Sequence, residues 1–273
     1  MNKVLITYAR HDFQLSISPV FIPIARGGRG KHRMEVNYKN KNGKIKVVSP
    51  WKLDIADESV LLAIIAIAGP RGKILSIGSK HERAIDFRKS LNEKEERETL
   101  AISTSLYEIC KLIGNSTGGK AKENVEKSLE RLAATTIFIE VAGEKWNSKI
   151  LSFRRDKKLR LRIALNACSS NAILFNDINY TKIDLTERAG LKNDTTKAIH
   201  RRLSALVWPS HSTKVGVDTL IKGVFGEKDF EEKNMGKRRE RVRKALRSIN
   251  EYPAWKIKVE NNMVNVWRKN IKP

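Results

Sequence analysis

The chain has 273 residues, of which 40% are hydrophobic and 31% are charged, and its formal net charge is +24. This length and composition allow one large core or two of ordinary size, which excludes a protein that is disordered over most of its length. So large an excess of cations predicts a polyanionic partner, either a nucleic acid or an anionic membrane surface.

Cysteine usage and hydropathy favour a soluble, cytoplasmic protein. Two cysteines indicate no disulfide framework, and Cys110 falls on an apolar stripe where a small core residue is expected. The first residues lack the pattern of a signal peptide. The longest apolar run, Val60 to Ala68, is far shorter than the roughly 18 residues that a membrane span needs. We therefore expect no membrane partner.

The first 50 residues predict a loop followed by a hairpin. Arg26 and Arg29 lie in a glycine-rich loop, where backbone amides could approach a phosphate closely. A simple flexible loop explains the same glycines equally well. Residues 34–48 alternate between apolar and polar on both sides of Asn42-Gly43, a dipeptide that predicts a β-hairpin.

An apolar helix is expected after this hairpin. Asp57 is predicted as its N-cap, apolar residues surround it on all sides, and Gly69-Pro70 marks its end. Such a helix would form the buried axis of the first half. Residues 78–98 are charged and irregular, and we expect a surface loop with some helical turns there.

Two helices and three strands follow. Ser103 or Thr104 is predicted to cap a short helix, and a second helix is expected from about Lys120 to Ala134. Strands are expected over residues 136–142, 149–155 and 159–165, with turns between them. Helix, turn, helix and hairpin is the order of a winged helix, whose second helix enters the major groove while the hairpin lies over the DNA backbone.

The second half repeats this order without repeating the sequence. Asn166 begins a short helix, a longer helical stretch from about Asp184 is interrupted near residues 190–194, and Asp218 is predicted to cap another short helix. The last two strands are expected on either side of Asn261-Asn262. The predicted fold class is α+β, a tandem winged helix with an N-terminal β-hairpin extension. Its domains comprise residues 1–165 and 166–273.

The densest cluster of cations lies within residues 234–252, which also have the periodicity of a helix. Val242, Ala245, Leu246 and Ile249 share one stripe, which predicts packing on a core. Between positions 237 and 247 the remaining faces carry one acid and seven cations, which are Lys237, Arg238, Arg239, Arg241, Arg243, Lys244 and Arg247. Solvated faces usually mix both signs, so this segment predicts a DNA-reading helix, with a solvated cationic face as the alternative.

Position around each helix divides the expected roles of the candidate residues. Arg238 and Arg239 lie at the edges of the apolar stripe and are expected to hold phosphates. The candidates for reading bases on this helix are Lys237, Arg243, Lys244 and Arg247. The closing strands supply a basic wing with Lys256, Lys258, Arg268 and Lys269. The outer side and flank of the N-terminal helix carry Lys120, Asn124, Lys127 and Arg131.

Motifs for catalysis are weak. Gly114 to Lys120 satisfies G-x-x-x-x-G-K, but Ala121 stands where a P-loop needs Ser or Thr, and the segment follows a helix instead of a strand. The five histidines lack metal-ligand spacing, and no serine nucleophile elbow occurs. We therefore expect no catalytic residue, metal or cofactor. A nucleotide-dependent enzyme using Lys120 is the less favoured alternative.

Several ordered segments point to a known family. They are RHD at 10–12, RGGRGKH at 26–32, AIAGPRG at 66–72, LRIALN at 161–166, HRRLSALVWPS at 200–210, VDTLIKGVFG at 217–226 and KRRERVRKAL at 237–246. Together they resemble the iteron-binding replication initiator, replication protein C, of IncQ-type broad-host-range plasmids. The similarity runs over nearly the whole chain and is densest in its C-terminal third.

The resemblance implies a tandem winged-helix protein that binds repeated double-stranded DNA at a plasmid origin, helps open the adjacent duplex and recruits the replicative helicase. It also implies that the initiator is not an enzyme. The two reading helices would lie over residues 120–131 and 237–247. A winged-helix transcription repressor shares this fold and charge and is an alternative, and the sequence leaves open whether the protein acts as a monomer or a dimer.

Overall fold

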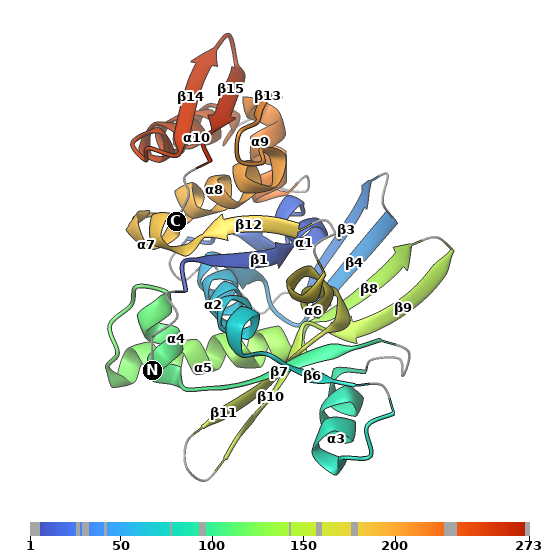
Figure 1. Cartoon of the computed structure of the whole chain (residues 1–273). Coiled ribbons are helices and arrows are strands. Elements are labelled where there is room, and N and C mark those ends of the chain that lie inside the picture. The colour runs from blue at the N-terminus through green and yellow to red at the C-terminus, as the bar shows by residue number, and fades with distance from the viewer. Residues whose placement is uncertain are drawn as a thin grey trace.

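Two copies of one helix–strand–helix–helix–hairpin plan occupy the lower and upper parts of the molecule in Figure 1. The computed structural model describes residues 6–25, 28, 33–40, 43–76, 78–92, 97–141, 143–156, 160–175, 180–226 and 234–270. The first copy consists of α2 (Ile55–Arg71), β7 (Thr99–Thr104), α4 (Leu106–Leu112), α5 (Gly119–Ala134), β10 (Leu151–Arg155) and β11 (Leu161–Leu165). The second consists of α8 (Asp194–Leu206), β13 (Ser212–Gly216), α9 (Val217–Phe225), α10 (Met235–Asn250), β14 (Trp255–Glu260) and β15 (Met263–Arg268).

The two copies also share one strand order. In each, the last strand of the hairpin lies between the other two, giving β10-β11-β7 in the first copy and β13-β15-β14 in the second. β6 (Lys73–Leu75) extends the first sheet beside β7. The repeated plan expected from the sequence is therefore present, and the same pairing scheme arises from unrelated residues.

A separate four-stranded sheet is built from two hairpins that are far apart in the sequence. Its strands, in order, are β3 (Met34–Asn40), β4 (Gly43–Ser49), β8 (Thr136–Val141) and β9 (Glu144–Lys149). Ile45, Val47, Ile137 and Ile139 are buried at alternate positions of the two central strands, which fixes their register. The hairpin predicted for residues 34–48 is confirmed.

The strands expected over residues 136–165 do not form one wing. β8 pairs with β9 on one side and with β4 on the other, whereas β10 and β11 belong to the sheet that contains β7. Three strands joined by short turns can pair in several ways. Pairing with β4 places Ile137 and Ile139 of β8 opposite Val47 and Ile45, so that the two strands share one buried apolar face. The hairpin that follows α5 in the plan is thus β10–β11.

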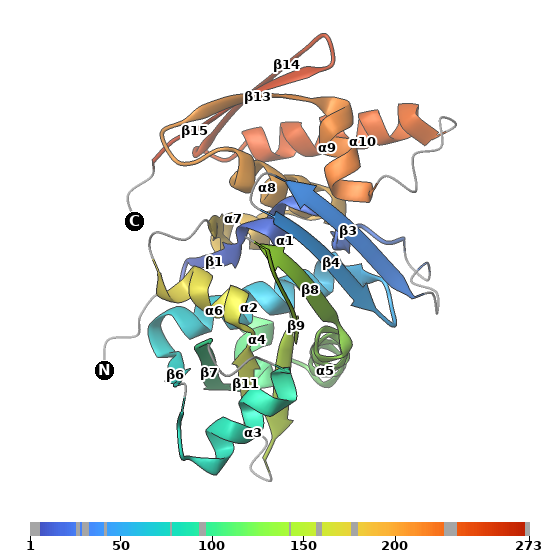
Figure 2. The same cartoon turned by 90° about the vertical axis from the view of Figure 1, so that its right-hand side faces the viewer.

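The two halves are joined through the N-terminal segment. β1 (Tyr8–Asp12) pairs antiparallel with β12 (Tyr180–Asp184), so the first strand lies beside the second half of the chain. Figures 1 and 2 show this pair between α2 and α8. The remaining elements near the junction are α1 (Phe13–Ile17), β2 (Phe21–Ile22), β5 (Leu53–Asp54), α6 (Ala167–Leu174) and α7 (Leu185–Gly190). A division at residue 165 separates the two plans, but one cluster of buried apolar side chains contains residues from both.

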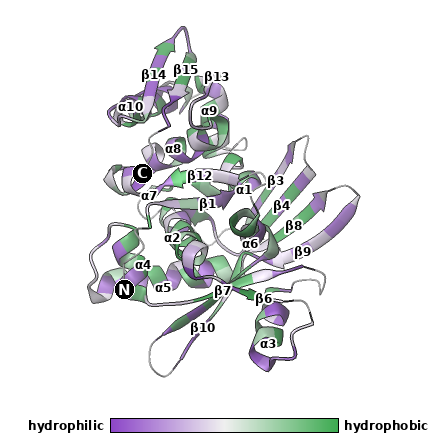
Figure 3. Cartoon of the chain, viewed as in Figure 1, coloured by the Kyte–Doolittle hydropathy of each residue, from purple (hydrophilic) through white to green (hydrophobic). Residues whose placement is uncertain are grey.

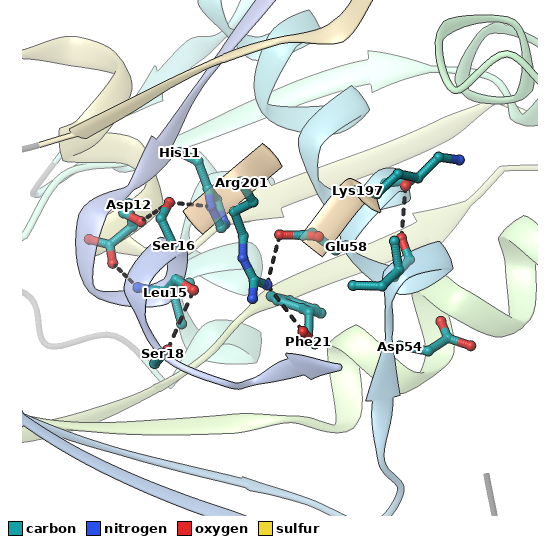
Figure 4. A network of polar contacts seen from close by, with 12 residues as sticks. His11, Asp12, Leu15, Ser16, Ser18, Phe21, Asp54, Glu58, Lys197 and Arg201 are labelled. Atoms are coloured by element: carbon teal, nitrogen blue, oxygen red, sulfur yellow. Dashed lines mark hydrogen bonds and ion pairs between the residues drawn. The ribbon is translucent and has the colours of Figure 1, made fainter. Parts of the chain in front are cut away.

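A buried ion network crosses this junction. Glu58 of α2 accepts hydrogen bonds from Arg188 Nη2 at 2.6 Å and from Arg201 Nη1 at 2.9 Å, and Glu58 and Arg201 are fully buried. Arg201 also donates to the carbonyl of Phe21 at 3.2 Å (Figure 4). Burial raises the pKa of Glu58, but the charges of Arg188 and Arg201 outweigh it and hold the pKa below its usual value.

The ends of α2 differ from the prediction. Its N-cap is Asp54, which accepts from the amides of Ala56 and Asp57, while the side chain of Asp57 accepts from the Asp54 amide in return. Asp57 is therefore the third residue of a capping box and not the cap. The helix also continues through Pro70 to Arg71, because a proline in the last turn removes only one backbone bond.

Two further local predictions need correction. The short helix α4 is capped by Ser105, since the two residues before it complete β7. The region expected as a surface loop with some helical turns contains α3 (Glu82–Leu91), one continuous ten-residue helix. Phe87 and Leu91 lie one turn apart and are buried against Leu75. A single apolar pair among many charged residues is too weak a signal to predict this helix.

Burial elsewhere follows the apolar pattern. Cys110 is buried in the main core, as expected. α2 has buried residues along most of its length, whereas α10 shows both hydrophilic and hydrophobic colours (Figure 3). In the part of the chain that the structure describes, no helix is both long and apolar enough to cross a membrane.

Replacing Glu58 by Gln is expected to destabilise the protein by about 3–5 kcal/mol, because it leaves two buried guanidinium groups without their counter-charge. Urea denaturation monitored by circular dichroism measures this change. Glu140→Gln is the control, since Glu140 pairs with Lys44 at the surface, where solvent screens the pair and its loss should change stability little. Equal losses in the two variants would contradict a special role for the buried network.

Acid is expected to weaken the fold through His11. Burial lowers the pKa of His11 from 6.5 to about 4. His11 therefore binds a proton more weakly in the folded state than in the unfolded chain. The free energy of unfolding falls as pH drops from about 6.5 to about 4, by up to about 3 kcal/mol. His11→Asn should flatten this dependence in urea denaturation measured across pH, and exposed His211→Asn should leave it unchanged. A dependence that survives His11→Asn would assign it to other groups.

Candidate nucleic-acid interface

The C-terminal helix α10 is packed as its sequence predicts. Met235, Val242, Ala245, Leu246 and Ile249 are buried, which confirms the expected apolar stripe. This face lies against α8, α9 and β14. The opposite side of the helix therefore points to solvent.

Five of the seven cations of α10 are exposed and form no ion pair with any residue in the described ranges. They are Lys237, Arg241, Arg243, Lys244 and Arg247. They include all four residues expected to read bases. Because they come from one helix with a single acid, Glu240, they make the most strongly cationic surface among the helices in the described part of the chain.

Arg238 and Arg239 have partners within the protein. Arg239 donates from Nε and Nη2 to the two carboxylate oxygens of Asp218, both at 2.8 Å, and its hydrogen bonding holds the pKa of Asp218 below the usual value. The guanidinium of Arg238 lies 5.3 Å from the ring centre of Phe225. Asp218 does not cap α9, whose N-cap is Gly216. The ion pair between Arg239 and Asp218 instead links α10 to α9. Arg238 and Arg239 therefore position the helix.

The hairpin that follows α10 is only partly as expected. Lys256 and Lys258 are exposed on β14, and Lys258 pairs with Glu260 at 2.6 Å. Arg268 is 5% exposed, donates to the carbonyl of Lys182 at 3.1 Å and lies over the ring of Trp255. It therefore holds the hairpin to the core, and we remove it from the candidate surface because burial prevents contact with DNA.

The N-terminal helix α5 presents a nearly neutral face. Lys120 and Lys127 both donate to Glu123, at 3.0 and 2.6 Å, and their hydrogen bonds lower the pKa of Glu123 to about 2. Asn124 is exposed beside this chain of ion pairs. Arg131 points away from it and makes a bidentate contact with buried Asp57. Arg131 is thus an anchor for α5 and is a poor candidate for DNA contact.

Pairing of the hairpins reveals cations that the sequence reading missed. Arg154 and Arg155 lie on β10, and Arg160 and Arg162 lie beside or on β11. Arg155 pairs with Glu126 of α5 at 2.8 Å, which brings this hairpin against the helix. The alternating sequence LRLRIAL places Arg160 and Arg162 on one face and was the available signal. Arg26 and Arg29 lie outside the described residues.

The glycine-rich segment before α5 connects two helices. Gly114 has a positive φ of 73°, the segment ends at the N-cap Gly118, and Lys120 pairs with Glu123. A P-loop would instead connect a strand to a helix. This placement favours a turn between α4 and α5.

The exposed helices lie on opposite sides of the junction. In Figures 1 and 2, α10 lies above and α5 below the layer formed by α2, β1, β12 and α8. The hairpins β14–β15 and β10–β11 project at the two ends. The described arrangement thus presents two separate helix-and-hairpin surfaces on one shared core.

Two solved structures are similar to this chain over nearly its whole length. The Pi initiator protein, solved in complex with iteron DNA, is similar with a TM-score of 0.55 and 11% identity, covering 95% of this chain and 96% of that one. Domains 2 and 3 of RctB are similar with a TM-score of 0.52 and 10% identity, covering 93% of this chain and 100% of that one. The chain therefore has the mixed α+β fold of replication initiator domains.

The family model of replication protein C (RepC) matches residues 3–269, which is nearly the whole chain. The chain belongs to the replication protein C family. A search of curated proteins gave no match. The family confirms the resemblance seen in the sequence, whereas the individual site residues remain predictions.

Replacing Glu123 by Gln is expected to release Lys120 and Lys127 for phosphate contacts. Affinity for random duplex DNA should rise about threefold to tenfold at low salt, and the dependence of affinity on salt should become steeper. Fluorescence anisotropy at several salt concentrations measures both. Glu130→Gln is the matched control, because Glu130 is exposed on the same helix and the change in net charge is identical. An equal rise in both variants would show that net charge alone matters.

Proposed function

We propose that this protein is a plasmid replication initiator that binds repeated double-stranded DNA at an origin through two winged-helix units. The observation that carries the proposal is the repeated plan, because a winged helix has this order of elements and this strand order. Each unit presents the helix that would enter the major groove and the hairpin that would lie over the backbone. Membership of the replication protein C family supports the same function.

The C-terminal unit would supply most of the electrostatic attraction. Arg243, Lys244 and Arg247 are exposed on the solvent side of α10, where Arg or Lys can donate to the acceptors of guanine. Lys256 and Lys258 extend the cationic surface onto the hairpin, where phosphate contacts are expected. Released counterions would make this binding strongly dependent on salt.

The N-terminal unit would contribute by hydrogen bonding more than by charge. Asn124 is exposed on α5, and an Asn side chain can bond to both the N6 and N7 atoms of adenine. Lys120 and Lys127 are held in place by Glu123, which restricts their rotamers before DNA arrives. This unit therefore fits a reading role with low non-specific affinity.

The two units together would cover about two helical turns of a repeat, with their helices in successive major grooves. The Pi initiator protein has a similar fold and was solved with iteron DNA, which supports repeats as the ligand. Opening of the neighbouring duplex and recruitment of the replicative helicase follow as further parts of the proposal. They need no catalytic residue in this chain.

Replacing Arg243, Lys244 and Arg247 together by Ala is expected to weaken binding to the cognate repeat at least about a hundredfold, because base contacts contribute about 1–3 kcal/mol each. Binding to random duplex DNA should weaken much less. Electrophoretic mobility shift at fixed salt measures both. Lys80, Arg83 and Lys89 are three exposed cations in or near α3, and their triple Ala variant matches the change in charge. Equal losses on both DNAs would assign the α10 residues to phosphates.

Replication itself separates an initiator from a repressor of the same fold. A plasmid that carries the cognate origin should replicate only when the protein and the plasmid-encoded replication enzymes are supplied. The α10 triple variant should fail to support replication. Lys120→Ala should leave DNA opening intact, which would contradict a nucleotide-dependent enzyme that uses Lys120. Repeat binding without replication would favour the repressor.

A further inference from the structure

The outward face of the sheet β3-β4-β8-β9 carries an aromatic side chain that the core does not use. Phe138 lies on the central strand β8 and is 42% exposed. Its neighbours in the strand, Ile137 and Ile139, point inward and are buried. The solvated face of an antiparallel sheet is normally polar, so a phenyl ring at its centre indicates a binding surface.

Strand register places polar groups around this ring. Asn37, Lys46 and Asn147 lie in one row with Phe138, and the next row contains Lys39, Lys44, Glu140 and Lys145. These two rows line a hollow of about 500 Å³. In Figure 2 the sheet lies between α10 and α5. The hollow is thus distinct from both helix surfaces.

The charge of this face favours a polyanion. Four lysines line the hollow with one acid, Glu140, which pairs with Lys44 at 3.0 Å and Lys145 at 3.7 Å. Lys46 pairs with Glu35 outside the hollow. A second copy of the chain would bring the same lysines face to face, which is repulsive.

The exposed ring indicates that the polyanion is single-stranded nucleic acid. In duplex DNA the faces of the bases are stacked on each other, so a protein ring on a sheet cannot reach them. Unpaired bases stack on aromatic side chains while cations follow the backbone. Four-stranded sheets with exposed aromatic residues bind single strands in this way in other proteins.

We infer that the outward face of β3-β4-β8-β9 binds single-stranded DNA, with an unpaired base stacked on Phe138 and phosphates beside Lys39, Lys44 and Lys46. Asn147 lies beside Phe138 in this row, and Asn37 lies at its end beyond Lys46, so both amides can bond to the edges of bases along the strand. The inference rests on the proposed function only for the source of the strand, which would be the duplex opened beside the repeats.

The test uses the full chain and fluorescein-labelled oligothymidylate of about 12 nucleotides, a length in the range that one such surface covers. Fluorescence anisotropy should show that Phe138→Ala binds this strand at least about tenfold more weakly than the wild type. Phe138→Trp keeps an aromatic face and should retain the affinity. Phe175→Ala is the matched control, because Phe175 is the same residue type with 43% exposure, and it should change nothing.

Photo-cross-linking locates the strand directly. An oligothymidylate with one iododeoxyuridine should cross-link to a peptide that contains Phe138, as identified by mass spectrometry. Cross-links confined to α5 or α10 would overturn the inference. Unchanged oligothymidylate binding by Phe138→Ala would also overturn the inference. If light scattering showed that Phe138→Ala has a lower molar mass than the wild type while it still binds oligothymidylate, the face would be assigned to self-association instead.

The triple Ala variant of α10 separates this inference from the proposed function. That variant should lose the duplex repeat and keep oligothymidylate, whereas Phe138→Ala should do the reverse. If the wild-type protein binds repeats but no single strand, only the inference fails. If it binds oligothymidylate but no repeat, the proposed function fails.

Discussion

The buried carboxylate of Glu58 is the interaction on which the arrangement of the molecule depends. It extends from α2, the first helix of one plan, and receives Arg201 from α8, the first helix of the other, together with Arg188 from α7. One carboxylate faces two guanidinium groups that are almost fully buried, so the geometry tolerates little displacement. The two exposed helices are therefore linked through the centre of the protein, where α2 packs against α5 and α8 packs against α10.

The two helix surfaces are chemically different although they share one plan. α10 keeps five cations exposed and uses Arg239 to attach itself to α9, whereas α5 neutralises Lys120 and Lys127 with Glu123 and attaches itself to α2 through Arg131. In the proposed function, α10 would supply most of the long-range attraction to DNA, and α5 would add contacts with little non-specific affinity.

Much of this was predictable from local patterns. Apolar spacing identified α5 and α10 with their buried faces, Asn42-Gly43 identified the β3–β4 hairpin, and the repeated order of elements indicated two similar units. Predictions were wrong where a local signal had two solutions. Asp57 has the sequence context of a cap, but Asp54 takes that place. The strand β8 has the context of a wing, but β4 offers it an apolar partner.

The sequence by itself indicated a polyanionic partner and the two helices, because charge and periodicity are properties of neighbouring residues. Its ordered segments also resembled the family that the family model shows. Only the tertiary structure decided which cations face solvent. Arg131 meets Asp57 across 74 residues, Arg201 meets Glu58 across 143, and Arg268 meets the carbonyl of Lys182 across 86. The outward position of Phe138 likewise depends on the pairing of two distant hairpins. An arginine looks the same in the sequence whether its guanidinium group binds a phosphate or a buried carboxylate. Only the fold brings the partner of that group within reach.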